Sequence, residues 1–325
     1  MKCILFFLLL FCTKPVFCHE LRIKRNLEQI LKKELLDVSD IRSVSVLIMD
    51  AESTTIIDSI SFVVNQKKYT RCSLKNIIIP GTALARSVNY ITFLRLGIKP
   101  REFYVDTGLY EDSISTCQIM DDTYSHGGIG RASVYTSFLY NSTTGFIKAA
   151  DTIYEKKMWK YKAALKRLGL SIFHSDLDFE SEEPEDHYDF WNPCEIMGIR
   201  KSPLSMFEYC NSIREMICHQ EGEQLLLSSA RDSLISIMRD NTLYGLGCFA
   251  KSNRVSLGTI TDVSPTDVNG CRMSTCTAVL PYDQPSFLIS VAVERRSEHF
   301  GTAIPCRIAR KIAELFSNLY FRHFQ

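Results

Sequence analysis

Cysteine and histidine are the residue types that could bind a metal or form cross-links here, because the 325-residue chain holds 12 cysteines and 7 histidines. Zinc and redox sites need such residues at short spacing, as in C-x-x-C pairs or H-E-x-x-H. Neither pattern occurs, and the closest couple, Cys271 and Cys276, lacks the second pair that a zinc ribbon needs. We therefore interpret the thiols as buried structural residues, with room for one or two disulfides, and expect no metal and no cofactor.

The densest cluster of charge is acidic and lies at Ser175–Asp189, around Pro184. A calcium loop needs a D-x-D-x-D-G spacing, which this segment lacks, so we interpret it as a solvated loop. Over the whole chain, 38 Lys and Arg against 37 Asp and Glu leave a net charge of +1. Nucleic-acid binding needs a basic excess or a basic face, so nucleic acid is not an expected partner.

The N-terminus has the pattern of a secretory signal, in which Lys2 precedes the apolar stretch Cys3–Cys12. Such a stretch spans about half of a bilayer core as a helix, so a signal peptide at residues 1–18 is favoured over a membrane anchor. We expect export to the periplasm or cell envelope, with an uncleaved, membrane-associated N-terminus as the alternative. Cleavage leaves 12 − 3 = 9 cysteines, so at least one thiol is free or paired between chains.

Hydrophobic periodicity predicts the elements that must position any functional side chain. A helical lead-in is expected at residues 19–40. Strands are predicted at Ser43–Met49, Thr54–Phe62, Arg254–Ile260, Thr275–Leu280 and Phe287–Glu294. Helices are predicted at Thr82–Leu96, Ser133–Leu168 with a break near Asn141–Gly145, Pro203–His219, Gln224–Met238 and Ala303–Phe321, and a loop is predicted at Pro100–Arg131. Strands at both ends around a helical middle predict an α+β fold in which the termini form one sheet.

Short motifs follow one another along these elements in a definite order. They are Pro80–Ala85 (P-G-T-A-L-A), Asn141–Phe146 (N-S-T-T-G-F), Met197–Ile199 with Ser202–Leu204 (M-G-I, S-P-L), Val255–Thr259 (V-S-L-G-T), Pro281–Pro285 and Gly301–Pro305. In this order the chain from about residue 40 resembles the transpeptidase domain of penicillin-binding proteins, and its segment 97–141 is similar to the class B, division-type members.

The resemblance implies a domain at 41–325 with the fold shared by this family and the serine β-lactamases. That fold has a central antiparallel sheet formed by N- and C-terminal strands, flanked by helices and joined to a helical subdomain. It also implies a link to peptidoglycan synthesis or cell division. The implied ligands are a peptidoglycan stem peptide or a β-lactam, and the implied partners are cell-envelope or division proteins.

The chemistry of that family needs a serine that attacks a D-alanine carbonyl or a β-lactam and forms an acyl-enzyme. A lysine one helical turn later accepts the proton, a Ser-x-Asn segment relays it, and Lys-Thr-Gly on a strand binds the substrate carboxylate. The motif-equivalent positions in this sequence are Thr82, Ala85, Asn141, Thr143, Ser256, Leu257, Gly258 and Thr259.

These positions lack the side chains that the reaction requires. Thr82 carries a hindered hydroxyl, Ala85 cannot accept a proton, and the cation of the strand motif is lost. Arg86 projects about 100° away around the helix and stays protonated, so it is a poor base. We therefore expect a transpeptidase fold without an intact catalytic centre, with a binding or scaffold role.

Two other functions stay open at this point. One is a working D,D-transpeptidase, carboxypeptidase or β-lactam-binding protein of peptidoglycan, which covalent labelling by a fluorescent penicillin would reveal. The other is an unrelated secreted glycoprotein, because Asn141-Ser142-Thr143 is formally an N-glycosylation sequon. A glycosidase-sensitive mass would reveal that function.

Overall fold

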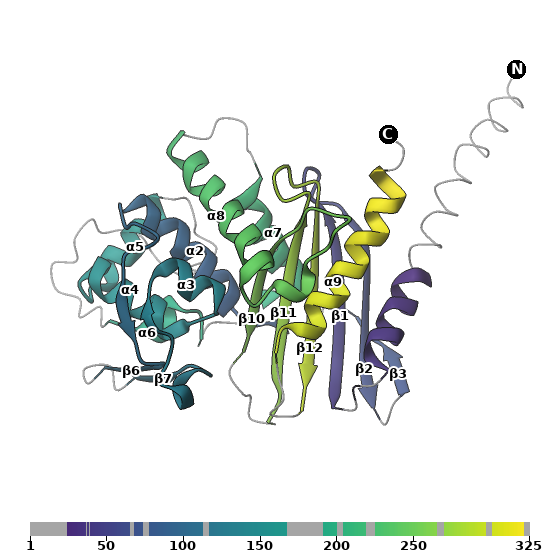
Figure 1. Cartoon of the computed structure of the whole chain (residues 1–325), viewed down its shortest axis with the longest axis horizontal. Coiled ribbons are helices and arrows are strands. Elements are labelled where there is room, and N and C mark those ends of the chain that lie inside the picture. Colours follow the sequence, from purple (N-terminus) through teal and green to yellow (C-terminus); the bar gives the residue numbers. More distant parts are fainter. Residues whose placement is uncertain are drawn as a thin grey trace, which may run out of the picture.

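The structure is a computed structural model (Figure 1) that describes residues 25–36, 38, 40–65, 68–73, 78–112, 117–167, 191–199, 204–218, 225–264, 270–296 and 301–321. The signal sequence at 1–18, the start of the lead-in and the acidic segment Ser175–Asp189 lie outside the described residues. The same holds for Ser202 and Pro203 of the third motif. The predictions for these segments therefore stay predictions.

A six-stranded antiparallel sheet occupies one half of the molecule (Figure 1). Its strand order is β10-β11-β12-β1-β2-β3, so the C-terminal strands lie beside the N-terminal ones. The strands are β1 (Ile41–Asp50), β2 (Ile56–Asn65), β3 (Lys68–Arg71), β10 (Gly258–Val263), β11 (Arg272–Leu280) and β12 (Phe287–Arg295). The predicted α+β fold, with one antiparallel sheet built from both ends of the chain, is confirmed.

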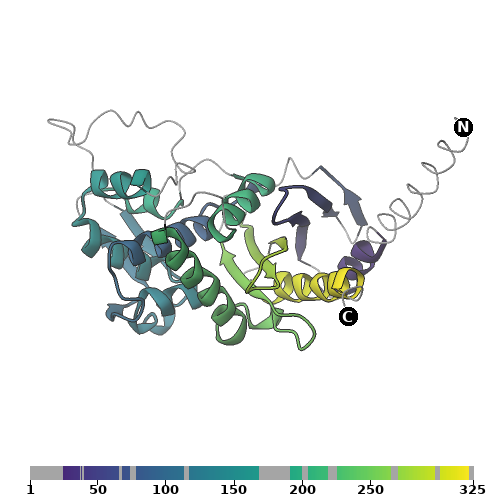
Figure 2. The ribbon, with the colours of Figure 1, turned by 90° about the horizontal axis from the view of Figure 1, so that it is seen from above.

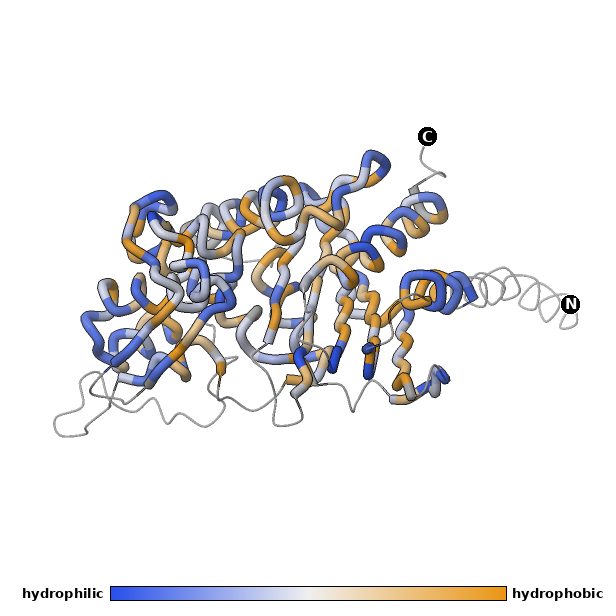
Figure 3. Tube along the Cα trace, turned by 60° about the horizontal axis from the view of Figure 1, so that its bottom comes forward, coloured by the Kyte–Doolittle hydropathy of each residue, from blue (hydrophilic) through white to orange (hydrophobic). Residues whose placement is uncertain are grey.

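Both faces of the sheet are covered, as the side chains of β1 show. Leu47 and Met49 are buried in a core shared with the helical block, whereas Val46 and Ile48 are buried in a second core beneath α9 (Ala303–Phe316). Successive side chains of a strand point to opposite faces, so the apolar run V-L-I-M contributes to both cores. In Figure 3 much of the length of these strands has the orange colour of hydrophobic residues.

One face of the sheet is covered by α9 together with a helix at residues 25–35. Ile304, Ile308 and Ile312 form a buried stripe along α9, as the periodicity predicts. Glu34 of the N-terminal helix accepts a hydrogen bond from Arg307 Nε at 3.2 Å and forms a further ion pair with Lys311. The predicted helical lead-in is thus confirmed over residues 25–35 and packs against the last helix.

The other face meets a block of helices (Figure 2). The block comprises α2 (Thr82–Arg95), α3 (Val134–Leu139), α4 (Thr143–Tyr154), α5 (Met158–Arg167), α6 (Pro193–Ile196), α7 (Met206–Ile217) and α8 (Leu225–Tyr244). The predicted break near Asn141 is confirmed. A second, unpredicted break follows α4, where Glu155 and Lys156 both take positive φ angles, 52° and 56°.

The prediction of a loop at Pro100–Arg131 is wrong in part. Short strands pair there as two ribbons, β5 (Tyr104–Asp106) with β8 (Gly130–Ala132) and β6 (Leu109–Asp112) with β7 (Cys117–Met120). The pair formed by β4 (Ile78–Ile79) and β9 (Leu204–Ser205) was not predicted either. Strands of two to four residues are too short for an alternating pattern to reveal them.

The described cysteines with defined side chains are free thiols, namely Cys72, Cys194, Cys210, Cys218, Cys248, Cys271, Cys276 and Cys306. Most of them are buried, in agreement with the interpretation as structural residues. Within the described part of the chain, no group of three His, Cys, Asp or Glu side chains could hold a metal ion. No described helix is long and apolar enough to cross a membrane.

Candidate functional site

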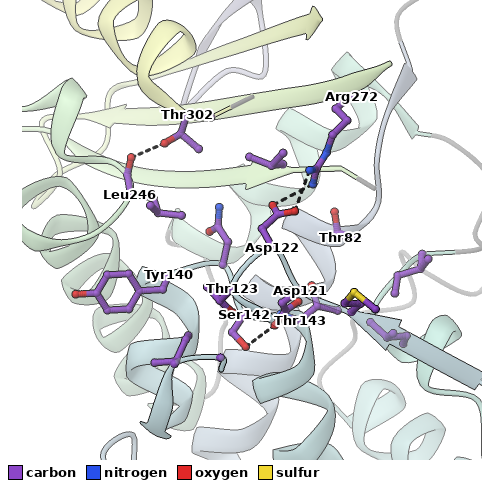
Figure 4. Close-up of a pocket in the computed structure, with 18 residues that line it drawn as sticks. Thr82, Asp121, Asp122, Thr123, Tyr140, Ser142, Thr143, Leu246, Arg272 and Thr302 are labelled. Atoms are coloured by element: carbon purple, nitrogen blue, oxygen red, sulfur yellow. Dashed lines mark hydrogen bonds and ion pairs between the residues drawn. The ribbon is translucent and has the colours of Figure 1, made fainter. Parts of the chain in front are cut away.

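A cavity of about 650 Å³ lies where the helical block meets the edge of the sheet (Figure 4). Its walls come from the start of α2, the start of α4, the loop after β7 and the ends of β10 and β11. Three predicted site positions, Thr82, Asn141 and Thr143, line this cavity together. The motif order along the chain therefore located a real junction between the two halves of the fold.

Thr82 is the first residue of α2 and is only 3% exposed. Its hydroxyl donates a hydrogen bond to Asp262 Oδ2 of β10, and the other carboxylate oxygen forms an ion pair with Arg86. A buried carboxylate is stable only with such partners. The hydroxyl at the nucleophile position is thus hydrogen-bonded to a carboxylate that is also ion-paired with Arg86.

Ala85 is buried at the place one helical turn after Thr82, and its methyl group offers no proton acceptor. Arg86 does not act as its substitute. Beyond the ion pair, the Arg86 guanidinium donates to the backbone oxygens of Thr261 at 3.2 Å and Asn141 at 3.3 Å. A guanidinium among these acceptors stays charged, so this group binds β10 to α2 rather than accepting a proton.

A close contact between two glycines fixes the start of α2. Gly198 has a φ of +64°, and a Cβ added there would lie 2.9 Å from the backbone carbon and oxygen of Gly81. The next residue, Ile199, lines the cavity. The M-G-I motif therefore brings its backbone against the P-G-T motif, which holds Thr82 at the cavity wall.

The start of α4 is built around two aspartates. Ser142 caps the helix by accepting from Gly145 N at 2.9 Å, and its hydroxyl lies 2.6 Å from Asp106 Oδ2 and 2.8 Å from Asp121 Oδ2. Thr144 Oγ1 likewise lies 2.8 Å from Asp106 Oδ1 and 2.6 Å from Asp121 Oδ2. Asp121 also accepts from the backbone N–H of Thr143 at 3.1 Å.

This arrangement holds two carboxyl groups around two hydroxyl hydrogens. Each hydroxyl can donate to one carboxylate at a time, so an extra proton on one aspartate would complete the network. Burial raises the pKa of Asp121, with a smaller contribution from the neighbouring Asp106 charge, while the hydrogen bonds from Thr144 and Ser142 act in the opposite direction. Asp121 lines the cavity, so its proton affects the charge of the wall.

The structure does not bring Ser256, Leu257, Gly258 or Thr259 into the cavity wall, which is a correction to the predicted strand motif. Strand β10 begins at Gly258 rather than at Arg254, because residues 253–255 form a bend. Leu257 is buried in the core beneath α9, and Thr259 Oγ1 lies 3.0 Å from Thr242 Oγ1 on α8. The part of β10 that reaches Thr82 is instead Thr261–Val263.

Side chains from α2 and α8 form hydrogen bonds with backbone carbonyls on the outer edge of β10, the edge that faces away from β11. The hydrogen bond from Ser264 N to Met273 O shows that the even-numbered residues of β10 direct their backbone N–H and C=O groups toward β11. The backbone groups of the odd-numbered residues therefore point away from β11. Of these outward carbonyls, that of Thr259 accepts from Asn241 Nδ2 at 3.0 Å and that of Thr261 accepts from Arg86. An added peptide strand could therefore reach β10 only at Val263, where the strand lines the cavity.

The sequon residue Asn141 turns inward. Its φ is +56°, its Oδ1 accepts from Thr261 Oγ1 at 3.4 Å, and its Nδ2 is buried without a hydrogen-bond partner among the described residues. A sugar would have to be attached to that nitrogen. The folded geometry is therefore unfavourable for glycosylation at this position.

An ion pair spans the cavity. Arg272, the first residue of β11, donates through NH1 to Asp122 Oδ1 at 2.8 Å and through NH2 to Asp122 Oδ2 at 3.0 Å, as Figure 4 shows. Asp122 belongs to the loop after β7, so the bridge joins the sheet to the ribbon side of the helical block. Both residues line the cavity.

Sequence reasoning missed the charged residues of this site. Asp262 had a usable signal, because it is the single charge in the strand sequence G-T-I-T-D-V and a buried charge needs a partner such as Arg86. Asp121, Asp122 and Arg272 lie at loop and strand ends, where their sequence neighbours give no comparable signal.

No protein-family model matches this sequence, and no curated protein matches it. Solved structures do match it. A peptidoglycan glycosyltransferase from Burkholderia ambifaria superposes with a TM-score of 0.66 at 12% identity, over 92% of this chain and 95% of that one. The transpeptidase domain of penicillin-binding protein 3 from Burkholderia pseudomallei gives 0.64 at 12% identity, over 92% and 95%.

The transpeptidase domain of the FtsI4 D,D-transpeptidase from Legionella pneumophila gives a TM-score of 0.60 at 13% identity, over 90% of this chain and 95% of that one. The likeness covers both the sheet and the helical block, and it confirms the fold that the motif order implied. The chain has the transpeptidase fold of penicillin-binding proteins.

Proposed function

We propose that this chain is an exported transpeptidase-fold protein that serves peptidoglycan synthesis or cell division by binding or as a scaffold, without acyl transfer. The fold supports the connection to peptidoglycan, because the similar structures include a peptidoglycan glycosyltransferase and the transpeptidase domains of a D,D-transpeptidase and of a penicillin-binding protein. The residues of the cavity support the loss of the reaction.

The observation that carries this proposal is the buried group formed by Thr82, Asp262 and Arg86. A nucleophilic hydroxyl must reach the substrate and give its proton to a base. Thr82 is 3% exposed, and its hydroxyl already donates to the Asp262 carboxylate, whose other oxygen forms an ion pair with Arg86. Among the described residues that line the cavity, none is a lysine or a histidine. Loss of a nucleophile or its base alone can cost on the order of a millionfold in turnover.

Export rests on the N-terminal sequence, with its basic start and short apolar stretch before Cys18. N-terminal sequencing of the mature protein from its own host should give His19 as the first residue. A mature protein that still begins at Met1 and stays with the membrane fraction would instead support the anchored form.

A fluorescent penicillin tests the absence of acyl transfer. Purified protein should keep no fluorescence on a denaturing gel after incubation with the reagent, whereas an active penicillin-binding protein treated in parallel should be labelled. Labelling at one penicillin per chain that disappears in Thr82→Ala would overturn the proposal and establish a working acyl-transfer enzyme. A mass shift sensitive to a glycosidase would instead show that this transpeptidase-fold protein is glycosylated.

A further inference from the structure

We propose that Cys276 and Cys306 form a disulfide bond in the mature protein, which joins strand β11 to helix α9. The bond would be a covalent modification of the core beneath α9, on the face of the sheet opposite the helical block. The oxidising surroundings that it needs come from the proposed export, the part of the proposed function on which this pairing rests. The choice of partners comes from the packing of the two side chains.

Both cysteines belong to the apolar core that α9 covers. Cys276 is fully buried on β11, on the same face as Ala278 and Leu280, because every second side chain of a strand points to one face. Cys306 is fully buried near the start of α9, and Figure 1 shows this helix lying along the sheet. The two thiols therefore enter one core, one from the strand and one from the helix.

Small side chains let α9 approach the sheet closely at this point. Ala309 and Ala313 follow Cys306 along the buried side of the helix at intervals of three and four residues, and Ala278 lies beside Cys276 on its face of β11. Burial and a hydrogen bond with Cys276 both raise the pKa of the Cys306 thiol. Two thiols in such contact need little movement to reach the Cβ spacing of about 3.8 Å that a disulfide requires.

Cys210 provides the contrast to this pair. It is equally buried, but it lies in the core that the sheet shares with the helical block, where its thiol is hydrogen-bonded to Ser290. The sheet separates this core from the one beneath α9, so Cys210 cannot bond to Cys276 or Cys306 in the folded protein. It is therefore a matched control for the loss of one buried thiol.

Formation of the bond needs an oxidant, and a small-molecule disulfide such as oxidised glutathione supplies it by exchange. One cysteine attacks a sulfur atom of the reagent and releases one reduced thiol, and the second cysteine then attacks the mixed disulfide and releases another. Two S–H bonds of the protein are thus replaced by one S–S bond, and the reagent takes up both electrons and both protons. Because burial disfavours the Cys306 thiolate, the exchange should occur during folding, before α9 covers the sheet.

The bond would close a long loop, since 306 − 276 = 30 residues separate the two cysteines. A cross-link over a loop of this length lowers the conformational entropy of the unfolded chain and so stabilises the folded state. The loop contains β12, the strand that joins the C-terminal strands to β1. The disulfide would therefore stabilise the attachment of the last helix to the centre of the sheet.

The experiment refolds residues 19–325 in oxidised and reduced glutathione, for wild type, Cys306→Ala and Cys210→Ala. Free thiols are then blocked with N-ethylmaleimide in denaturant, and a non-reduced tryptic digest is analysed by mass spectrometry. Trypsin places the two cysteines in separate peptides, Met273–Arg295 and Ser297–Arg307, each with a single cysteine. Wild type and Cys210→Ala should give these two peptides joined by a disulfide.

Thermal unfolding with and without a reductant measures what the bond contributes. The melting temperature of wild type and of Cys210→Ala should fall by about 5 °C on reduction. The melting temperature of Cys306→Ala should not depend on the reductant. Each variant is compared with itself, so the cost of the space that alanine leaves in the core cancels.

Refolded wild type in which the two peptides stay unlinked would overturn the pairing, and so would a bond from either peptide to another cysteine. Protein purified from its own host separates this inference from the proposed export. If the host protein begins at His19 and both thiols are free, the disulfide is overturned. If the refolded protein carries the bond but the host protein is cytoplasmic with both thiols free, the pairing stands and the proposed export fails.

Discussion

Arg86 on α2 and Asp262 on β10 form an ion pair in which the two side chains are 3% and 2% exposed. This pair joins the helix that carries Thr82 to the edge strand of the sheet. The Asp262 carboxylate also accepts a hydrogen bond from the Thr82 hydroxyl, and the Arg86 guanidinium also donates to the backbone carbonyl of Thr261 on β10. One buried group of contacts therefore joins the two halves of the fold at the position of Thr82.

Removal of one partner of this pair should be strongly destabilising. Asp262→Ala leaves the Arg86 charge buried without its carboxylate, which costs about 3–5 kcal/mol. The free energy of unfolding in urea measures this loss, and Asp122→Asn, which breaks a half-exposed pair, should lose only about 0–1 kcal/mol. The double variant Arg86→Met, Asp262→Leu should recover most of the stability. A loss below about 1 kcal/mol in Asp262→Ala would mean that the pair does not hold the junction.

Alanine at Gly198 should be much more harmful than alanine at Gly97. Both glycines have positive φ angles, +64° and +86°, so each substitution carries a backbone strain of about 1–2 kcal/mol. A Cβ at Gly97 meets nothing within 4 Å, whereas one at Gly198 lies 2.9 Å from the backbone of Gly81. Thermal unfolding of the two variants measures the difference. Equal losses would show that the Gly81–Gly198 contact is not tight in solution.

Asp121 should make stability depend on pH. Its folded pKa is raised by burial, so protonation favours the folded state, and its contribution is fully present below the unfolded pKa of about 3.9. That contribution is lost as pH rises through the raised folded value. The free energy of unfolding of wild type relative to Asp121→Asn should therefore fall as the pH rises above about 4. A difference that stays flat or increases as the pH rises above about 4 would contradict the raised pKa of Asp121.

The cysteines should differ sharply in reactivity. Cys248 is exposed, whereas Cys210 is fully buried and its burial raises its pKa to about 12. A maleimide at pH 7 should modify Cys248 within minutes and leave Cys210 untouched until the protein is unfolded, because only an accessible thiolate reacts. Peptide mapping after timed quenching gives the order. Native modification of Cys210 at a similar rate would show that the core around α7 opens readily.

Much of the fold was predictable because its long elements carry strong patterns. The strands β1, β11 and β12 and the helix α9 are each nine residues or longer, and each was found at its place in the chain. The ribbons between Pro100 and Arg131 have strands of three or four residues, which are too short to show an alternation of apolar and polar residues. The start of β10 was misplaced because Val255 and Leu257 also alternate, although they pack beneath α9 before the strand begins.

The site residues that could be predicted are those whose positions are set by the local sequence at the start of a helix. Thr82 and Asn141 begin or precede helices at recognisable motifs, and the structure brings both to the cavity. The partners of these residues come from distant parts of the sequence. Asp262 is 180 residues from Thr82, and Arg272 is 150 residues from Asp122, so only the folded chain shows which charge meets which.

Intact-protein mass spectrometry after incubation with a penicillin tests the central claim most directly, since an acyl-enzyme adds the whole mass of the drug to one residue. The buried group of Thr82, Asp262 and Arg86 predicts an unchanged mass after prolonged incubation, under conditions that fully acylate an active penicillin-binding protein. A single adduct that maps to Thr82 and is absent from Thr82→Ala would contradict the claim that this fold has lost acyl transfer.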